Sequence, residues 1–369
     1  MNLSGTVFMI LLFLSTATAQ ETTLKDAFKN SFYIGTALNR GQIYGKDECV
    51  NKLLATQFNS ITPENILKWE KVHPKPEEYN FEPVDKLMEL AETNHMVLIG
   101  HVLVWHSQTP GWVFEDEPGQ LTNRETLLKR MQAHIATVAG RCKGRIHGWD
   151  VVNEAFEDNG DLRKSKWLKI IGEDYIQKAF EFAREADPEA ELYYNDYNMW
   201  KPGKVRAVVQ MVRDLKEKGV KVDGIGMQGH WGLDYPKNLE EVDAAIAAFA
   251  GVGCKVVITE MDLNMLPLPD RNTGADISRN IKAGKELNPY PECLPDSMVN
   301  VQNERYAAFF KIFHKHRDAI TRVTFWGVSD RNSWLNNWPV FGRTNYPLLF
   351  DRQCQPKPVF KAVIETAKE

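Results

Sequence analysis

Two glutamates in this chain each follow a short apolar run of the kind that forms a buried β-strand. Glu154 ends the stretch IHGWDVVNE, and Glu260 lies inside the later stretch KVVITEMD. A facing pair of carboxyl groups can hydrolyse a glycosidic bond, because one protonates the leaving oxygen while the other meets the anomeric carbon, directly or through a water. A separation of about 5–5.5 Å gives retention of configuration, and about 6.5–9.5 Å gives inversion. The pair can act only if the fold brings the two strands together.

The neighbours of the two glutamates indicate different protonation states. Glu154 follows an apolar run and Asn153, with no cation nearby in the sequence, which favours a neutral carboxylic acid. Asp262 follows Glu260 by two residues and therefore lies on the same strand face, where two ionised acids repel. A donor between them would relieve the repulsion, and His230, at the end of the preceding β-rich run, is the natural candidate. The pattern favours Glu154 as the acid and an ionised Glu260 as the nucleophile.

Polar and aromatic side chains also gather at the ends of the other β-rich runs. The candidates are Asn39; Glu64, Asn65 and Lys68; His101, Trp105 and His106; Asn195, Asp196 and Tyr197; Gln228; and Trp326, Asp330 and Trp334. Polar residues commonly follow strands, and tryptophans commonly pack in a core, so each residue has an ordinary explanation. Glu, His and Trp inside the runs fit that explanation less well. They favour one convergent site in which polar groups bind hydroxyls and indole rings cover sugar faces.

The elements that must position these residues are eight β-rich runs that alternate with amphipathic stretches. The runs are FYIGTALN, FNSITPEN, MVLIGHVLVWH, IHGWDVVNE, ELYYNDYN, GIGMQGHW, KVVITEMD and RVTFWGVSD. Helical spacing separates them, as in the stripes Leu127–Met131–Ile135–Val138, Val205–Val208–Val209–Val212–Leu215 and Tyr306–Phe309–Phe310–Phe313. Thr122 and Glu125 are placed as a capping box for the first stripe, and Gly219 stops the second. Strands that alternate with helices pair in parallel, so the sequence predicts a single-domain α/β protein, a (β/α)8 TIM barrel with its site where the strands end.

Composition narrows the class of ligand. The 369 residues are 43% hydrophobic with a formal net charge of -4, which gives no electrostatic basis for nucleic acid or for an anionic membrane surface. A neutral substrate fits this balance better, and the 10 tryptophans suit stacking on flat ligands as well as core packing. His101 and His106 do not have the spacing of a zinc site and would point to opposite faces of a strand. We therefore expect no metal and no cofactor.

The amino terminus and the cysteines bear on the compartment. Residues 1–19 combine an apolar run with an A-x-A-like cleavage site and are predicted to be a signal peptide, which leaves 20–369 as the catalytic barrel of a secreted protein, extracellular or periplasmic. No later segment is long and apolar enough for membrane insertion. The five scattered cysteines leave at least one thiol free, and we expect mostly buried residues with room for one disulfide whose pairing the sequence does not give.

The motifs together resemble glycoside hydrolase family 10, the endo-β-1,4-xylanases. The matching strings, in this order, are TPENILKW, GHVLVWH, WDVVNEAF, YYNDYN, QGHW, ITEMD and FWGVSD. The resemblance implies a retaining barrel with Glu154 as acid/base and Glu260 as nucleophile, Asn153 on the 2-hydroxyl of the sugar, and His230 and Asp262 in support of Glu260. The positions that it assigns to the glycone subsites are Glu64, Asn65, Lys68, His101, Trp105, Gln228, Trp326 and Trp334, and those near the cleavage point are Asn195 and Tyr197. It also implies xylan and xylo-oligosaccharides as partners, and we expect a monomer.

Two features depart from the family pattern, and two other functions stay open. The stretch from Asn264 to about Asn303 is predicted to form an extended loop beside the seventh strand. Arg331 is bulkier than the small residue that many relatives have there, and is expected to narrow the cleft or to pair with Asp330. A barrel glycosidase that acts on β-glucan or another β-linked glycan is one alternative. A non-catalytic glycan-binding barrel is the other, although its signature, the loss of a carboxylate, is absent.

Overall fold

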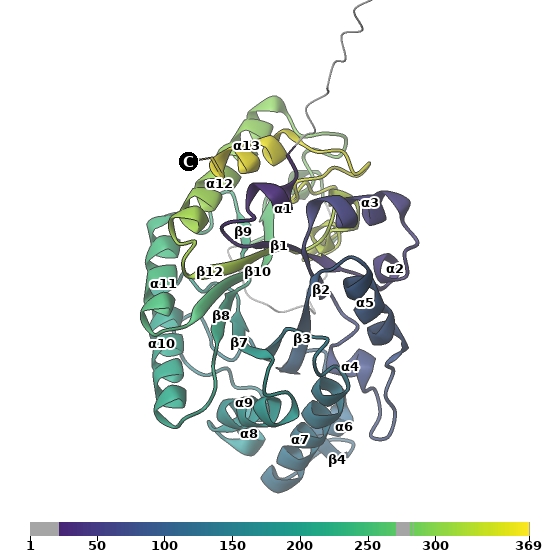
Figure 1. Cartoon of the computed structure of the whole chain (residues 1–369), viewed down its shortest axis with the longest axis vertical. Coiled ribbons are helices and arrows are strands. Elements are labelled where there is room, and N and C mark those ends of the chain that lie inside the picture. Colours follow the sequence, from purple (N-terminus) through teal and green to yellow (C-terminus); the bar gives the residue numbers. More distant parts are fainter. Residues whose placement is uncertain (1–21, 271–280, 283, 369) are drawn as a thin grey trace, which may run out of the picture.

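The computed structural model describes residues 22–270, 281–282 and 284–368, and its centre is a closed parallel barrel. The barrel strands are β1 (Tyr33–Leu38), β2 (Ser60–Pro63), β3 (Val97–Trp105), β6 (Gly148–Asn153), β7 (Glu191–Asp196), β8 (Gly224–Met227), β10 (Lys255–Asn264) and β12 (Ile320–Phe325). They pair in this order, and β12 closes the ring by pairing with both β10 and β1. The predicted (β/α)8 barrel is therefore confirmed, and Figure 1 shows the ring of strands enclosed by helices.

Helices surround the barrel because each predicted stripe buries its apolar side against the strands. The helices are α1 (Leu24–Ala27), α2 (Arg40–Ile43), α3 (Glu48–Gln57), α4 (Trp69–Val72), α5 (Glu82–Thr93), α6 (Gly111–Phe114), α7 (Arg124–Arg141), α8 (Lys166–Ile171), α9 (Tyr175–Ala186), α10 (Pro202–Glu217), α11 (Glu240–Gly251), α12 (Asp296–Lys315) and α13 (Pro358–Thr366). The stripes on α7 and α12 are fully buried. Gly219, with φ of +74°, follows the end of α10 as predicted, because glycine adopts this conformation at little steric cost.

The predicted capping box at the start of α7 is wrong by one residue. The N-cap is Asn123, whose side-chain oxygen accepts the Thr126 amide at 3.0 Å. Thr122 is instead buried in the preceding loop, where its amide donates to the Phe114 carbonyl. Asparagine caps helices at least as well as threonine, so Asn123 is an equally suitable cap one residue further along the chain.

The segment after β10 ends earlier than the sequence predicts. α12 begins at Asp296, so residues 296–303 are helical rather than part of an extended loop. The loop carries a short strand, β11 (Ile281–Lys282), paired in parallel with β13 (Val340–Phe341), and a 3-10 turn, η1 (Lys285–Leu287). On the outer rim, β4 (Glu115–Glu117) and β5 (Gln120–Leu121) form a small antiparallel pair. Residues 271–280 and 283 of the predicted loop lie outside the described residues, whereas Leu268, near its start, lines the cleft at the carboxyl end of the barrel.

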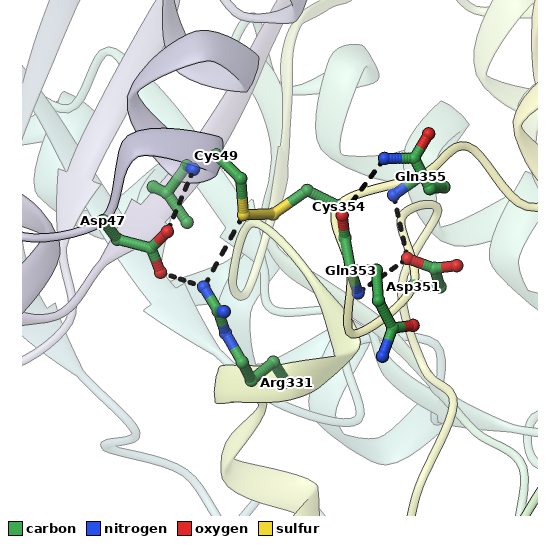
Figure 2. Close-up of a disulfide and its surroundings, with 8 residues drawn as sticks. Asp47, Cys49, Arg331, Asp351, Gln353, Cys354 and Gln355 are labelled. Carbon is green, nitrogen blue, oxygen red and sulfur yellow. Dashed lines mark hydrogen bonds and ion pairs between the residues drawn. A yellow bond between two sulfur atoms is a disulfide. The ribbon is translucent and has the colours of Figure 1, made fainter.

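A disulfide joins the first and the last βα units of the barrel, next to the pairing of β1 with β12 that closes it. Cys49 at the start of α3 bonds to Cys354, 305 residues later, in the loop before α13 (Figure 2). Because β1 and β12 pair, the first and last βα units are neighbours in space although they are distant in sequence. Cys142 and Cys254 are buried free thiols, and Cys293 is an exposed one.

Both sequence-based expectations for Arg331 are wrong. Its side chain in η2 (Asp330–Asn332) donates to Asp47 and lies 3.6 Å from the Cys49 sulfur, which places it at the disulfide rather than in the cleft (Figure 2). Asp330 is buried and pairs with Lys357 at 2.9 Å. Because adjacent residues of a tight turn point in different directions, the two side chains find different partners.

The predicted signal peptide, residues 1–19, lies outside the described residues and stays a prediction. Among the residues described from position 22 onward, no helix is long and apolar enough to cross a bilayer.

Removal of the disulfide should lower the thermal stability of the protein. The bond restricts a very long loop in the unfolded chain, and native disulfides typically contribute about 2–5 kcal/mol. We expect the double variant Cys49→Ser/Cys354→Ser to melt roughly 5–10 °C lower by calorimetry. Cys293→Ser, which changes an exposed free thiol, is the control and should melt with the wild type. An unchanged melting temperature of the double variant would show that the bond does not contribute.

Candidate active site

A cleft of about 470 Å³ opens at the carboxyl ends of the barrel strands. Most of the residues that the sequence singled out line it: Glu64, Asn65, Lys68, His101, Trp105, Asn153, Glu154, Tyr197, Gln228, His230, Glu260, Asp262, Trp326 and Trp334. Asn39, His106, Asn195, Asp196 and Asp330 were candidates for the same site but do not line the cleft. They come from different strands, but parallel strands of a barrel all end at the same rim. The common polarity of the strands therefore explains why residues scattered over the chain meet.

Glu154 is held by neutral donors in a buried position just after β6. Its two carboxyl oxygens accept from Trp105 Nε1 at 2.8 Å and from Gln228 Nε2 at 2.9 Å. Burial raises the pKa of Glu154, the charge of Glu260 adds to the rise, and the two hydrogen bonds only partly offset it. A carboxyl group in this environment retains its proton to higher pH than an ordinary glutamate, as a general acid requires.

Glu260, within β10, is equally buried but has the opposite electrostatic environment. Its oxygens accept from Asn195 Nδ2 at 2.8 Å and pair with His230 Nε2 at 3.0 Å. Burial by itself would raise the pKa of Glu260, but the His230 hydrogen bond and the charges of His101 and His230 outweigh it and lower the pKa below its usual value. Glu260 is therefore ionised where Glu154 is still protonated.

His230 lies between two carboxylates. The short strand β9 (His230–Gly232) runs beside the end of β10 and aligns His230 with Asp262. The two ring nitrogens are 3.0 Å from Asp262 Oδ1 and 3.0 Å from Glu260 Oε2. Burial opposes charge on the ring, yet the two carboxylates outweigh it and raise the pKa of His230 to about 10. The imidazolium therefore offsets the repulsion that the sequence predicts between Glu260 and Asp262.

Three side-chain amides link the two glutamates. Asn153 Oδ1 accepts from Asn195 Nδ2 at 2.9 Å and from Gln228 Nε2 at 3.3 Å, and these same two amides contact Glu260 and Glu154 respectively. The Asn153 oxygen accepts both of these bonds, and its amide nitrogen is the group that can donate a hydrogen bond to a ligand. Gly226 makes room for this arrangement, since a Cβ there would come within 2.4 Å of Asn195 Oδ1.

Lys68, which follows β2, adds a cation to the polar side chains that line the cleft. Lys68 Nζ donates to Asn65 Oδ1 at 3.0 Å and to Gln108 Oε1 at 2.9 Å, and it lies 4.8 Å from the centre of the Trp105 ring. Burial lowers the pKa of Lys68, opposed by the charges of Glu260, Glu64 and Glu154. Burial also raises the pKa of Glu64, and the positive charge of Lys68 partly offsets this rise. These groups offer both donors and acceptors to a hydroxylated ligand.

Fixed indole rings form the walls. Trp334, in the turn η3 (Trp334–Asn336), donates from Nε1 to Asp262 Oδ2 at 2.6 Å and stacks on Trp338 with ring centres 4.5 Å apart. Trp326 meets the His101 ring edge-on, and His101 is itself held by Asp150 at 2.8 Å. Rings that are fixed by such contacts lose little entropy when a flat ligand packs against them.

Sequence reasoning missed several residues at the cleft. Those that also line it are Glu70, Gln108, Asn198, Trp231, Tyr235, Asn264, Leu268, Leu335, Trp338 and Pro339. Arg163 does not follow a strand, yet its Nε donates to the Glu154 carbonyl at 2.9 Å and its Nη2 to the Tyr197 hydroxyl at 2.5 Å. Gln108 has a local signal, because it lies three residues after β3. Trp338 lies far beyond the end of β12, and no strand directly precedes it. Arg163 has no such signal either.

His106 takes no part in the cleft lining, and burial lowers its pKa to about 4. Across the described ranges, no group of three His, Cys, Asp or Glu side chains is arranged to hold a metal ion.

Comparison with known proteins places the chain in a family. The model of glycosyl hydrolase family 10 matches residues 23–366. An endo-1,4-β-xylanase A of Xylanibacter ruminicola is 48% identical over 357 residues, 97% of this chain and 96% of that protein. A solved GH10 endoxylanase from a sugarcane soil metagenome has a TM-score of 0.89 at 45% identity, and another solved structure, in complex with xylotriose, has 0.83 at 38%; each comparison covers 93% of this chain and 99% of the other. These findings confirm the resemblance carried by the motifs: the chain belongs to glycosyl hydrolase family 10.

Proposed function

We propose that this chain is an endo-1,4-β-xylanase that cleaves internal xylosidic bonds with retention of configuration. The observation that carries the proposal is the contrast between the two buried glutamates. Burial favours the protonated form of Glu154 and outweighs the hydrogen bonds from Gln228 and Trp105, whereas the His230 imidazolium favours the ionised form of Glu260. Two carboxyl groups with pKa values moved apart in this way have the protonation states that a double displacement needs.

The reaction proceeds in two steps. In the first, a Glu260 oxygen bonds to the anomeric carbon while the glycosidic C–O bond breaks, and the Glu154 proton passes to the departing oxygen. In the second, Glu154 takes a proton from a water whose oxygen attacks the same carbon, and the bond to Glu260 breaks. The two inversions give net retention, and Glu154 ends protonated as it began. The amide nitrogen of Asn153 donates to the 2-hydroxyl, which strengthens the attack.

Xylan and xylo-oligosaccharides are the proposed substrates. Lys68, Glu64 and Asn65 bind hydroxyls at one side of the cleft, and Trp334 and Trp326 pack against sugar faces. The likeness to a solved structure that holds xylotriose supports a ligand of this class. We further propose that the protein is secreted and monomeric. The Cys49–Cys354 bond supports secretion, since disulfides persist in oxidising compartments.

Loss of the nucleophile should abolish turnover but not binding. We expect Glu260→Ala to reduce kcat on xylan by at least about 10⁴-fold, since no covalent intermediate can form. Xylotetraose should still bind when measured by calorimetry. Proton NMR of the wild-type reaction should show the β-anomer first. Wild-type turnover in the variant, or an α-anomer as the first product, would refute the assigned roles.

Replacement of His230 should move the acidic limb of the pH profile. Activity needs ionised Glu260, whose pKa is held down by the charge and hydrogen bond of His230. His230→Asn keeps a donor but removes the charge, so the pKa of Glu260 rises and the acidic limb of kcat/KM moves to higher pH by about one unit or more. His316→Asn, which removes a histidine paired with Asp243 outside the cleft, should leave the profile unchanged. An acidic limb that stays in place in His230→Asn would contradict this electrostatic role.

The relative rates of cleavage of xylan and of other β-linked glycans test the proposed substrate. Trp334 and Lys68 line the cleft and are held by hydrogen bonds, and a hexose has to fit an additional hydroxymethyl group beside them. We expect initial rates on soluble xylan to exceed those on soluble mixed-linkage β-glucan by about 10-fold or more. Faster cleavage of the glucan would assign this chain a different substrate.

A further inference from the structure

The backbone at Glu154 takes an unusual conformation that strand β7 holds in place. Glu154 has φ of +58°, in the left-handed region that non-glycine residues rarely occupy and that has to be stabilised by its surroundings. Its own amide donates to the Asn195 carbonyl at 2.9 Å. The next two amides are held by side chains of β7: Ala155 N donates to the Tyr194 hydroxyl at 3.0 Å, and Phe156 N to Asp196 Oδ2 at 3.4 Å.

Asp196 is the centre of this support. It is fully buried, and its Oδ2 also accepts from the Tyr194 hydroxyl at 2.5 Å. Its Oδ1 accepts from Lys204 Nζ at 2.9 Å and from the Tyr197 amide at 2.8 Å. Lys204, on α10, is itself fully buried and lies 3.9 Å from the centre of the Tyr197 ring. The carboxylate therefore connects the turn after Glu154 to β7 and to a buried cation.

Asp196 also carries a charge close to the acid/base. Burial raises the pKa of Asp196 to about 6; the charge of Lys204 lowers this pKa, and the charge of Glu154 raises it. Burial and, after it, the charge of Asp196 raise the pKa values of Tyr175, from α9, and of Tyr197. Asp158 lies 3.6 Å from Lys204 Nζ, and Arg163 donates to the Glu154 carbonyl and to the Tyr197 hydroxyl. Because the repulsion between two carboxylates is mutual, Asp196 opposes ionisation of Glu154 above about pH 6, where Asp196 is itself ionised.

We infer that Asp196, acting with Tyr194 and Lys204, is a positioning residue for the acid/base: it fixes the left-handed turn that aims Glu154 at the glycosidic oxygen, and its charge helps to keep Glu154 protonated. The inference rests on the proposed function. It assigns a role to side chains that do not line the cleft and do not contact the substrate. Their effect is confined to proton transfer, so it should depend on how much protonation the leaving group needs.

The test compares kcat/KM on two substrates, because this parameter reports steps only up to formation of the glycosyl-enzyme. Xylotetraose needs a proton on its leaving oxygen, whereas 2,4-dinitrophenyl β-xylobioside has a leaving group that departs without one. We expect Asp196→Asn to lower kcat/KM on xylotetraose by about 10-fold or more and on the aryl substrate by less than about 3-fold. The basic limb of the xylotetraose profile should move to lower pH, since the pKa of Glu154 falls when the neighbouring charge is removed.

A second variant separates position from charge and guards against a folding defect. Tyr194→Phe removes the hydroxyl that holds the Ala155 amide but keeps Asp196. It should lower kcat/KM on xylotetraose several-fold, spare the aryl substrate, and leave the basic limb nearer to that of the wild type. If Asp196→Asn does not fold, as judged by its melting transition, the substrate ratio of Tyr194→Phe decides alone.

Controls identify which proposal fails if the result is negative. Asp223→Asn changes a carboxylate that accepts the Leu192 amide at the opposite end of β7, and it should behave as wild type on both substrates. Glu154→Ala, measured in parallel, should lose activity on xylotetraose far more than on the aryl substrate. Equal losses in Glu154→Ala would overturn the proposed function. If Glu154→Ala shows the expected difference between the substrates, two results would overturn the positioning role. One is an equal loss of kcat/KM on both substrates in the Asp196 and Tyr194 variants. The other is a wild-type ratio of the two kcat/KM values in these variants.

Discussion

Glu154, Glu260 and Asp262 lie buried in one cleft, and the repulsion between their carboxyl groups is the constraint on which the rest of the site depends. His230 lies between Glu260 and Asp262, with a ring nitrogen 3.0 Å from each, so that one cation serves two anions. Glu154 receives its hydrogen bonds from two neutral groups, and burial decides its protonation. The same cleft therefore holds a proton donor and an ionised nucleophile at one pH.

The barrel makes this charge arrangement possible. Parallel strands deliver their carboxyl ends to one rim, and the short strand β9 aligns His230 with Asp262 beside β10. A relay of amides through Asn153 and Asn195 then fixes the distance and orientation of the two glutamates without adding charge. The left-handed turn at Glu154 is a strained element, and it persists because the following amides find acceptors on β7. Because the supporting elements are rigid, the reacting groups are held accurately in position.

Much of this architecture was predictable from local pattern. The eight β-rich runs and the stripes between them determine the barrel, and most of the polar residues that end the runs line one cleft. The errors occurred where a choice depends on distant contacts. Asn123 rather than Thr122 caps α7, with Thr122 buried in the loop before the helix, and Arg331 pairs with Asp47 beside the disulfide instead of entering the cleft. Arg163 had no local signal, since only folding brings it to the Glu154 carbonyl.

The sequence by itself determined the type and polarity of the strands, and therefore which residues meet at the rim, because both follow from the short-range alternation of side chains along the chain. It also indicated that Glu260 and Asp262 need a donor between them. It favoured a protonated Glu154 and an ionised Glu260 as well. Only the tertiary structure decided which contacts set these protonation states, the pairing of Cys49 with Cys354, and the support of Glu154 by Asp196 and Tyr194. These depend on burial and on contacts within a few ångströms between residues that are far apart in sequence, and no local pattern encodes such distances.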